Sequence, residues 1–210
     1  AINTVALGKF VESHYDGFAI VKKDELTRAE MASETGNSKL VMVRSCPGFP
    51  VNYYEHIDCT LNDQEFIVNP QEGSFIFIAD WQSFGIPSDV IVVGIENMEN
   101  FRSIRQQRKL FEHAIGAERL LFVSRYPQST DLRSWLQTIP NRYIHFGDFD
   151  LAGINIFLTE FFAYLGARSS FFIPQDIEER IAKGSLERYN DQYVRYNRIT
   201  SDSKELQDLI

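Results

Sequence analysis

The chain has few of the residues that mark disulfide-stabilised or zinc-binding proteins. It contains only 2 cysteines, Cys46 and Cys59, and its 4 histidines are scattered without the spacing of zinc ligands. We therefore expect two free, reduced thiols in a cytoplasmic protein, with a disulfide or a metal site as the alternative.

The sequence also lacks long hydrophobic runs. No apolar stretch approaches the roughly 18 residues of a membrane helix, so we expect no membrane association. The chain is nevertheless 44% hydrophobic and 13% aromatic over 210 residues. That is enough to bury a full core, in one large domain or two small ones.

The chain also has fewer basic than acidic residues, which gives it a net charge of −8. This net charge argues at first against nucleic acid as a partner. Most of the excess negative charge lies in residues 1–89, whereas residues 90–168 are nearly balanced. We expect this middle segment to be the surface that best tolerates a polyanion. A chance fluctuation on an evenly mixed surface is the alternative.

Apolar runs and turn residues divide the chain into three expected parts. Residues 1–89 form a β-rich α+β segment of unknown role, residues 90–174 alternate strands with helices, and residues 175–210 form a C-terminal helical extension. In the first part we expect strands over 18–21, 39–43, 65–68 and 74–78, a helix over 27–35 and an irregular stretch over 46–50.

The middle part predicts successive βα units. We expect strands over 90–95, 120–124, 143–146 and 170–173, and helices over 98–115, 130–138, 153–165 and from about 175. Continuous apolar strands linked by helices are typical of a parallel sheet that is buried on both faces. The predicted fold class is therefore α/β, an open sheet of about four mainly parallel strands with helices on both faces.

Acidic residues stand directly after two of the expected strands. Glu96 follows the first strand of the middle part, and Asp148 and Asp150 follow the third. Right-handed crossovers place the carboxyl ends of parallel strands at one edge, where ligands bind, so the three carboxylates should converge. Oxygen ligands suit Mg²⁺, with Mn²⁺ as a substitute, and Glu96 could alternatively act as a general acid or base.

Each carboxylate also has a purely structural interpretation. Asp150 could cap the following helix, Asp148 could accept bonds from loop amides, and Glu96 could complement a helix dipole. Gly147 and Gly153 would allow the backbone to approach closely on either side of the aspartates.

A basic stripe is predicted on the first helix of the middle part. Arg102, Arg105 and residues 108–109 recur at three-residue spacing and could follow the phosphates of DNA. The alternative is a solvated helix face, with ion pairs to Glu99 and Glu112.

The order of these motifs resembles the Toprim domain, a metal-binding module of topoisomerases, primases and several nucleases. The matching stretches are VVGIEN at 92–97, SRYP at 124–127 and HFGDFDLAG at 145–153. The similarity is greatest to the topoisomerase VI A subunit with its meiotic break-forming relatives, and to the JetD nuclease of Wadjet plasmid-defence systems. It covers roughly residues 88–170.

The resemblance implies that Glu96, Asp148 and Asp150 bind Mg²⁺ and catalyse phosphodiester chemistry on DNA, as in a nuclease or a topoisomerase. It also places Arg125 and Arg133 near DNA phosphates. It is compatible with a homodimer and with a partner ATPase outside this chain.

A break-forming relative also needs a nucleophilic tyrosine, usually on a winged-helix domain before the Toprim segment. Tyr53 and Tyr54 are the candidates here, but adjacent tyrosines in a β-rich region are more often packing residues, which favours a nucleophile upstream of Ala1. The loop at 124–128 reads SRYPQ, where the family usually carries a small residue followed by Gly-Tyr-Pro-Asp. Because of this departure, the resemblance does not assign a role to the loop at 124–128.

Three functions follow from the sequence. The first is a Mg²⁺-dependent DNA-acting enzyme, and the second is a Toprim-like scaffold that binds DNA or a partner without catalysis. The third is a phosphatase with Asp148 as nucleophile and Asp150 as acid or base. The Asp-x-Asp motif follows the third strand and precedes Leu151-Ala152-Gly153. Haloacid-dehalogenase-type phosphatases carry it on their first strand, so the phosphatase is the least favoured.

Overall fold

The computed structural model describes residues 46–116, 119–126, 129–201, 203–208 and 210. Residues from Pro47 onward form one compact unit. The strands expected over 18–21 and 39–43 and the helix expected over 27–35 lie outside the described residues.

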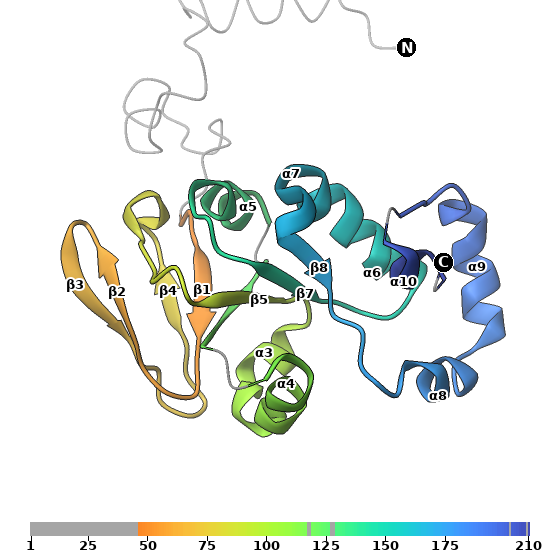
Figure 1. The fold of residues 1–210 in the computed structure, drawn as a ribbon, viewed down its shortest axis with the longest axis horizontal. Helices are drawn as coiled ribbons and strands as arrows, with labels where there is room; N and C mark the ends of the chain where they lie inside the picture. The colour runs from red at the N-terminus through yellow and green to blue at the C-terminus, as the bar shows by residue number, and fades with distance from the viewer. Residues whose placement is uncertain (1–45, 117–118, 127–128, 202, 209) are drawn as a thin grey trace, which may run out of the picture. The chain divides into compact units, whose positions relative to one another are not determined.

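One mixed sheet organises this unit, and its strands follow the order β4-β1-β6-β5-β7-β8 (Figure 1). Strands β6, β5, β7 and β8 run parallel, whereas β1 is antiparallel to both β6 and β4. The strands span Phe49–Asn52 (β1), Ile76–Ile78 (β4), Ile91–Ile95 (β5), Leu120–Ser124 (β6), Tyr143–Phe146 (β7) and Ser169–Phe171 (β8). The predicted α/β class with a mostly parallel sheet is confirmed.

The sheet continues across the expected boundary at residue 89. Strand β1 begins inside the stretch 46–50, which we expected to be irregular, so that expectation was wrong from Phe49 onward. Pro50 is tolerated there because the ladder between β1 and β6 begins only at Val51, which leaves its missing N–H outside that ladder.

A separate hairpin pairs β2 (Ile57–Leu61) with β3 (Gln64–Val68). We predicted β3 but missed β2. The two turn residues, Asn62 and Asp63, both have positive φ, at 53° and 59°. Such angles are typical of a two-residue type I′ turn, so Asn-Asp between two short runs was the available signal.

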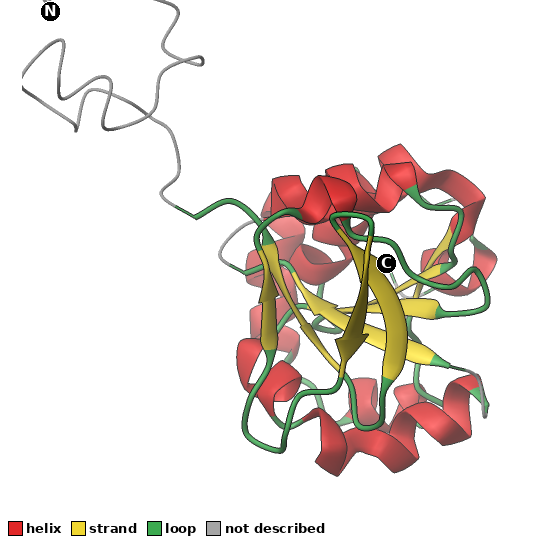
Figure 2. Cartoon of the chain, turned by 90° about the vertical axis from the view of Figure 1, so that its left-hand side faces the viewer, coloured by secondary structure: helices red, strands yellow, loops and turns green. Residues whose placement is uncertain are grey.

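Helices cover both faces of the sheet, as Figures 1 and 2 show. The helix expected over 98–115 is broken into α3 (Met98–Arg102), the 3₁₀ turn η3 (Ile104–Gln107) and α4 (Arg108–Ile115), which lie on one face. The opposite face carries α5 (Ser129–Thr138) and a second interrupted helix, which comprises α6 (Leu151–Ile156), the π-helical segment η4 (Phe157–Phe162) and α7 (Ala163–Leu165).

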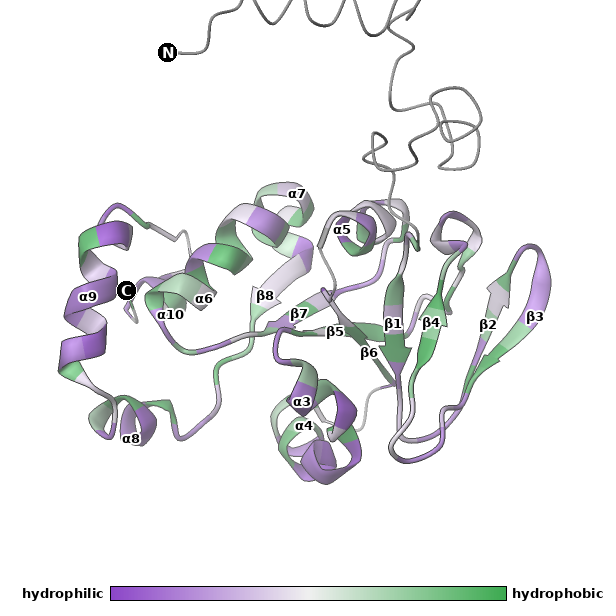
Figure 3. Ribbon diagram, turned by 180° about the vertical axis from the view of Figure 1, so that it is seen from behind, coloured by the Kyte–Doolittle hydropathy of each residue, from purple (hydrophilic) through white to green (hydrophobic). Residues whose placement is uncertain are grey.

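The core joins the first part of the described chain to the middle part. Trp135 of α5 is fully buried, its ring lies 5.0 Å from that of Phe49 and 5.4 Å from that of Phe84, and its Nε1–H donates to the Phe84 carbonyl over 2.8 Å. Apolar colouring accordingly gathers on the central strands in Figure 3.

The C-terminal part consists of α8 (Ile177–Ala182), α9 (Leu186–Tyr196) and α10 (Lys204–Gln207). Helix α9 is capped by the preceding Ser185, whose side chain accepts a hydrogen bond from the Arg188 amide. It is largely hydrophilic in Figure 3. Among the described helices, none is long and apolar enough to cross a membrane.

Candidate functional site

Three charged residues follow neighbouring parallel strands at one edge of the sheet. Glu96 follows β5, Arg125 follows β6, and Asp148 lies two residues beyond β7. The Glu96 amide donates to the Phe146 carbonyl over 3.0 Å, which holds the ends of β5 and β7 together. The expected convergence of these strand ends is therefore present in the fold.

The carboxylate of Glu96 is mostly buried, with 16% of its side chain exposed. Its Oε1 accepts a hydrogen bond from Nη1 of Arg125 over 3.2 Å. Its Oε2 is buried and has no hydrogen-bond partner among the described residues. Burial raises the pKa of Glu96, but the nearby His145 and Arg125 outweigh that effect, so the net pKa is lowered.

His145 supports Glu96 from inside the sheet. Its Nε2 lies 3.6 Å from Oε2 of Glu96, and its Nδ1 lies 2.9 Å from the hydroxyl of Tyr143. Burial lowers the pKa of His145 despite the nearby carboxylate, which favours the neutral ring. A proton on Nε2 then faces Glu96, and Nδ1 accepts the Tyr143 hydroxyl proton. The distance to Glu96 is too long for a hydrogen bond, so this contact is an electrostatic one.

Arg125 bridges two acidic residues. Besides Glu96, its Nη2 donates to Oε1 of Glu160 over 3.3 Å. Glu160 belongs to η4, and π-helical segments are frequent at functional sites. Oε2 of Glu160 is also buried without a partner among the described residues. The site therefore holds one guanidinium between two carboxylates that keep unused acceptor capacity.

The two aspartates of the acidic loop have different surroundings. Asp148 is exposed, and its pKa is raised by partial burial and then by repulsion from Glu96 and Asp150. Asp150 caps α6, because its Oδ1 accepts from the Gly153 amide over 2.8 Å, and its Oδ2 accepts from Nε2 of Gln192 over 2.8 Å. The structural interpretation of Asp150 as a helix cap is thus confirmed.

Both glycines of the loop are required by close packing, as predicted. A Cβ on Gly147 would lie 2.7 Å from Oε2 of Glu96 and 2.8 Å from Nε2 of His145. A Cβ on Gly153 would collide with the carbonyl oxygen of Asp148. Side chains at these positions would push the acidic loop away from Glu96.

The remaining predicted arginines are spread over other elements. Arg102 is exposed on α3, whereas the guanidinium of Arg105 donates to the carbonyls of Tyr54 and Pro70 over 2.9 and 2.7 Å. Arg133 stacks over the ring of Tyr164 at 4.2 Å. Arg105 thus connects the 3₁₀ turn η3 to the first part of the described chain. Because its guanidinium is already engaged, it is less available to a polyanion than that of the exposed Arg102.

The alternative interpretation of the predicted stripe is partly confirmed. Arg108 forms ion pairs with Glu112 and Glu55, so this part of the helix face carries compensated charge. The interruption at η3 also breaks the regular spacing on which the stripe depended.

Tyr53 and Tyr54 are packing residues, as we favoured. Both are buried, their rings lie 4.8 Å apart, and the Tyr54 ring lies 5.4 Å from that of Phe122. Burial raises the pKa of Tyr54 to about 12, which disfavours a reactive phenolate. Cys46 and Cys59 are both free thiols, the first exposed and the second buried.

A divalent cation is the group that the predicted carboxylates would hold. Among the described residues, no three His, Cys, Asp or Glu side chains are arranged as a metal-binding group. Mg²⁺ needs only one or two carboxylates, however, because water and substrate complete its shell. The buried, unpaired Oε2 of Glu96 and the destabilised anion of Asp148 suit that smaller set. Asp150, which already accepts two hydrogen bonds, suits it less.

Comparison with known proteins does not assign this chain to a family. No protein-family model and no curated protein matches the chain. The function must therefore be inferred from the site itself.

Several residues of the site were not predicted from the sequence. His145 lies within the motif at 145–153 and alternates with Tyr143 on β7, so a buried polar residue beside the acidic loop was a readable signal. Glu160 and Gln192 follow the loop by 10 and 42 residues, and nothing in their local sequence connects them to it.

Proposed function

We propose that this chain is a Toprim-like, Mg²⁺-dependent module that acts on the phosphodiester backbone of DNA. The observation that carries the proposal is the buried Oε2 of Glu96, which has no hydrogen-bond partner among the described residues, at the carboxyl edge of a parallel sheet. This oxygen is faced by the His145 N–H only at 3.6 Å, which is too long for a hydrogen bond, and a cation would stabilise a buried carboxylate oxygen that lacks one.

In this proposal Glu96 and Asp148 hold the cation. Asp150 shapes the loop that presents Asp148, and the lone pairs that its two hydrogen bonds leave free are available to the cation's water shell. When bound, the cation would stabilise the charge that develops on the phosphate and lower the pKa of a bound water. His145 keeps Glu96 oriented and supports its ionised form. Arg125 uses only part of its fork on Glu96 and Glu160, so further N–H groups can donate to a phosphate oxygen.

DNA is the proposed substrate because the middle segment carries little net charge and presents Arg102, Arg125 and Arg133 outside the core. A homodimer, an upstream winged-helix domain and a partner ATPase remain proposals that rest on the Toprim resemblance.

The test is cleavage or relaxation of supercoiled plasmid with Mg²⁺ or Mn²⁺ by the wild type, Glu96→Gln and Asp148→Asn. We expect activity in the wild type and its loss in both variants. Asp89→Asn is a matched control, because Asp89 is an exposed carboxylate paired with Arg119 at the opposite end of β5. Equal activity in the wild type and both site variants would exclude this site as the catalytic centre.

A second candidate function is a scaffold that binds DNA without cleaving it. It is favoured by Arg125, whose guanidinium already neutralises Glu96, and by the lack of a three-ligand metal group among the described residues. DNA binding by the wild type with no cleavage in either metal would support the scaffold. No contact between described residues of the site supports a phosphatase that uses Asp148 as nucleophile. Its expected acid or base, Asp150, already accepts hydrogen bonds from Gly153 and Gln192.

A further inference from the structure

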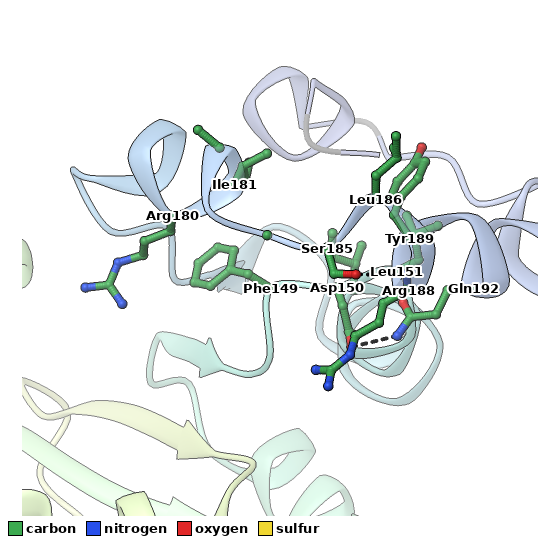
Figure 4. Close-up of a pocket in the computed structure, with 13 residues that line it drawn as sticks. Phe149, Asp150, Leu151, Arg180, Ile181, Ser185, Leu186, Arg188, Tyr189 and Gln192 are labelled. Carbon is green, nitrogen blue, oxygen red and sulfur yellow. Dashed lines mark hydrogen bonds between the residues drawn. The ribbon is translucent and has the colours of Figure 1, made fainter.

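Helix α9 reaches the acidic loop through one side chain, Gln192. Figure 4 shows its amide directed at Asp150, with Arg188 and Tyr189 of the same helix beside it. Nε2 of Gln192 donates to Oδ2 of Asp150 over 2.8 Å, and Oε1 accepts from the Ala152 amide over 3.3 Å. A residue 42 positions away in the sequence thus binds both the carboxylate and the first turn of α6.

The chemistry of the two partners fixes the orientation of the amide. A carboxylate only accepts hydrogen bonds, and a backbone N–H only donates, so the NH₂ group of Gln192 must face Asp150 and its oxygen must face Ala152. The reversed amide would place two acceptors against each other and two donors against each other. Glutamine therefore satisfies both groups, which neither a carboxylate nor an ammonium side chain can do.

Gln192 completes the restraint of Asp150. With the Gly153 amide on Oδ1 and Gln192 on Oδ2, each oxygen has one protein donor and keeps a further lone pair. Two donors on opposite oxygens prevent rotation of the carboxylate. They also restrain the loop that carries Asp148, whose carbonyl oxygen packs against Gly153.

Helix α9 also encloses space beside the loop. A cavity of about 620 Å³ lies between the acidic loop and the segment α8–α9, and its lining includes Phe149, Asp150, Ile181, Leu186 and Gln192. Gln192 therefore lines this cavity and also holds Asp150 of the acidic loop.

We infer that Gln192 is a positioning residue of the acidic site and that α9 is an integral part of that site. This inference rests on the proposed function, because it assigns Gln192 the task of holding Asp150 and the acidic loop ready for a divalent cation. Outer hydrogen-bond partners at metal sites typically contribute 10- to 100-fold to metal affinity, and Gln192 would act here through Asp150 and the loop that presents Asp148.

The probe is Mn²⁺ alone, with its affinity measured by calorimetry and its bound spectrum by electron paramagnetic resonance on the full chain. Gln192→Ala and Gln192→Met should each weaken Mn²⁺ binding about 10-fold or more and broaden the spectrum of the bound ion. Met keeps the length and helix propensity of Gln, so it separates the loss of the amide from the loss of packing. Asn190→Ala, an exposed amide on the same helix, should leave the affinity unchanged.

Two results would overturn the inference in distinguishable ways. If the wild type binds Mn²⁺ and Asp148→Asn does not, while Gln192→Met keeps the wild-type affinity, Gln192 has no positioning role and the proposed function stands. If the wild type itself does not bind Mn²⁺, the proposed metal site fails and the inference fails with it.

Discussion

Replacing Arg125 with methionine should destabilise the fold more than the loss of an ordinary surface ion pair. The guanidinium lies 3.2 Å from Glu96 and 3.3 Å from Glu160, whose side chains are only 16% and 28% exposed. Its removal leaves two partly buried carboxylates without the cation that both of them contact. Breaking a fully buried pair costs about 3–5 kcal/mol and an exposed pair about 0–1 kcal/mol, so we expect about 1–3 kcal/mol here.

The matched control lies at the other end of the same strand. Arg119 precedes β6 and pairs with Asp89 over 3.0 Å, but these side chains are 42% and 61% exposed. Arg119→Met should therefore cost less than about 1 kcal/mol. The free energy of unfolding of both variants is measured by urea denaturation at pH 7. Equal losses in the two variants would refute the argument that burial makes the Arg125 contacts matter.

The effect of Arg125→Met should also depend on pH. The pKa of Glu96 is lowered in the folded protein, so its stabilising contribution is present above its unfolded pKa, roughly 4.3. That contribution is lost as the pH falls through the lower, folded pKa. Without Arg125 the pKa of Glu96 rises, so the variant loses less stability on acidification. The difference between wild type and variant should therefore be constant from pH 7 to about 4.3 and shrink as the pH falls further, and a difference that stays constant below about pH 4.3 would contradict the electrostatic cause.

Two further predictions test the packing of the described unit. Trp135→Phe should lower the free energy of unfolding by about 2 kcal/mol in urea titrations, because it leaves the buried Phe84 carbonyl without the indole donor, and an unchanged midpoint would contradict this. In the native protein Ellman's reagent should modify Cys46 rapidly and Cys59 only on unfolding, since burial raises the pKa of Cys59 to about 12. The Cys46→Ser variant isolates the reaction of Cys59, and a rapid reaction of that thiol in the native protein would refute its burial.

Hydrophobic patterning was enough to predict the central architecture. The runs at 120–124 and 143–146 became β6 and β7 with the expected bounds, because a strand buried on both faces must be apolar throughout. The carboxylates after β5 and β7 lie at one edge for the same reason, since parallel strands leave no other arrangement of their carboxyl ends.

The sequence could not show which strands extend that sheet or how the helices end. Strand β1 contains a proline and is only 4 residues long, so its place between β4 and β6 depends on pairing partners far along the chain. The largely apolar pattern over 153–165 likewise concealed the π-helical segment that directs Glu160 toward Arg125.

The sequence by itself determined the βα order and the position of the acidic residues after two strands, whereas the contacts that exclude a side chain at Gly147 and Gly153 come from the structure. Only the tertiary structure decided what each carboxylate contacts. Glu96 contacts His145 and Arg125 but keeps one buried oxygen without a hydrogen bond from the described residues. Asp150 accepts hydrogen bonds from Gly153 and Gln192 on both oxygens and serves as a helix cap. The physical reason is that periodicity specifies which face a residue occupies, while its hydrogen bonds depend on partners brought close by the packing of other elements.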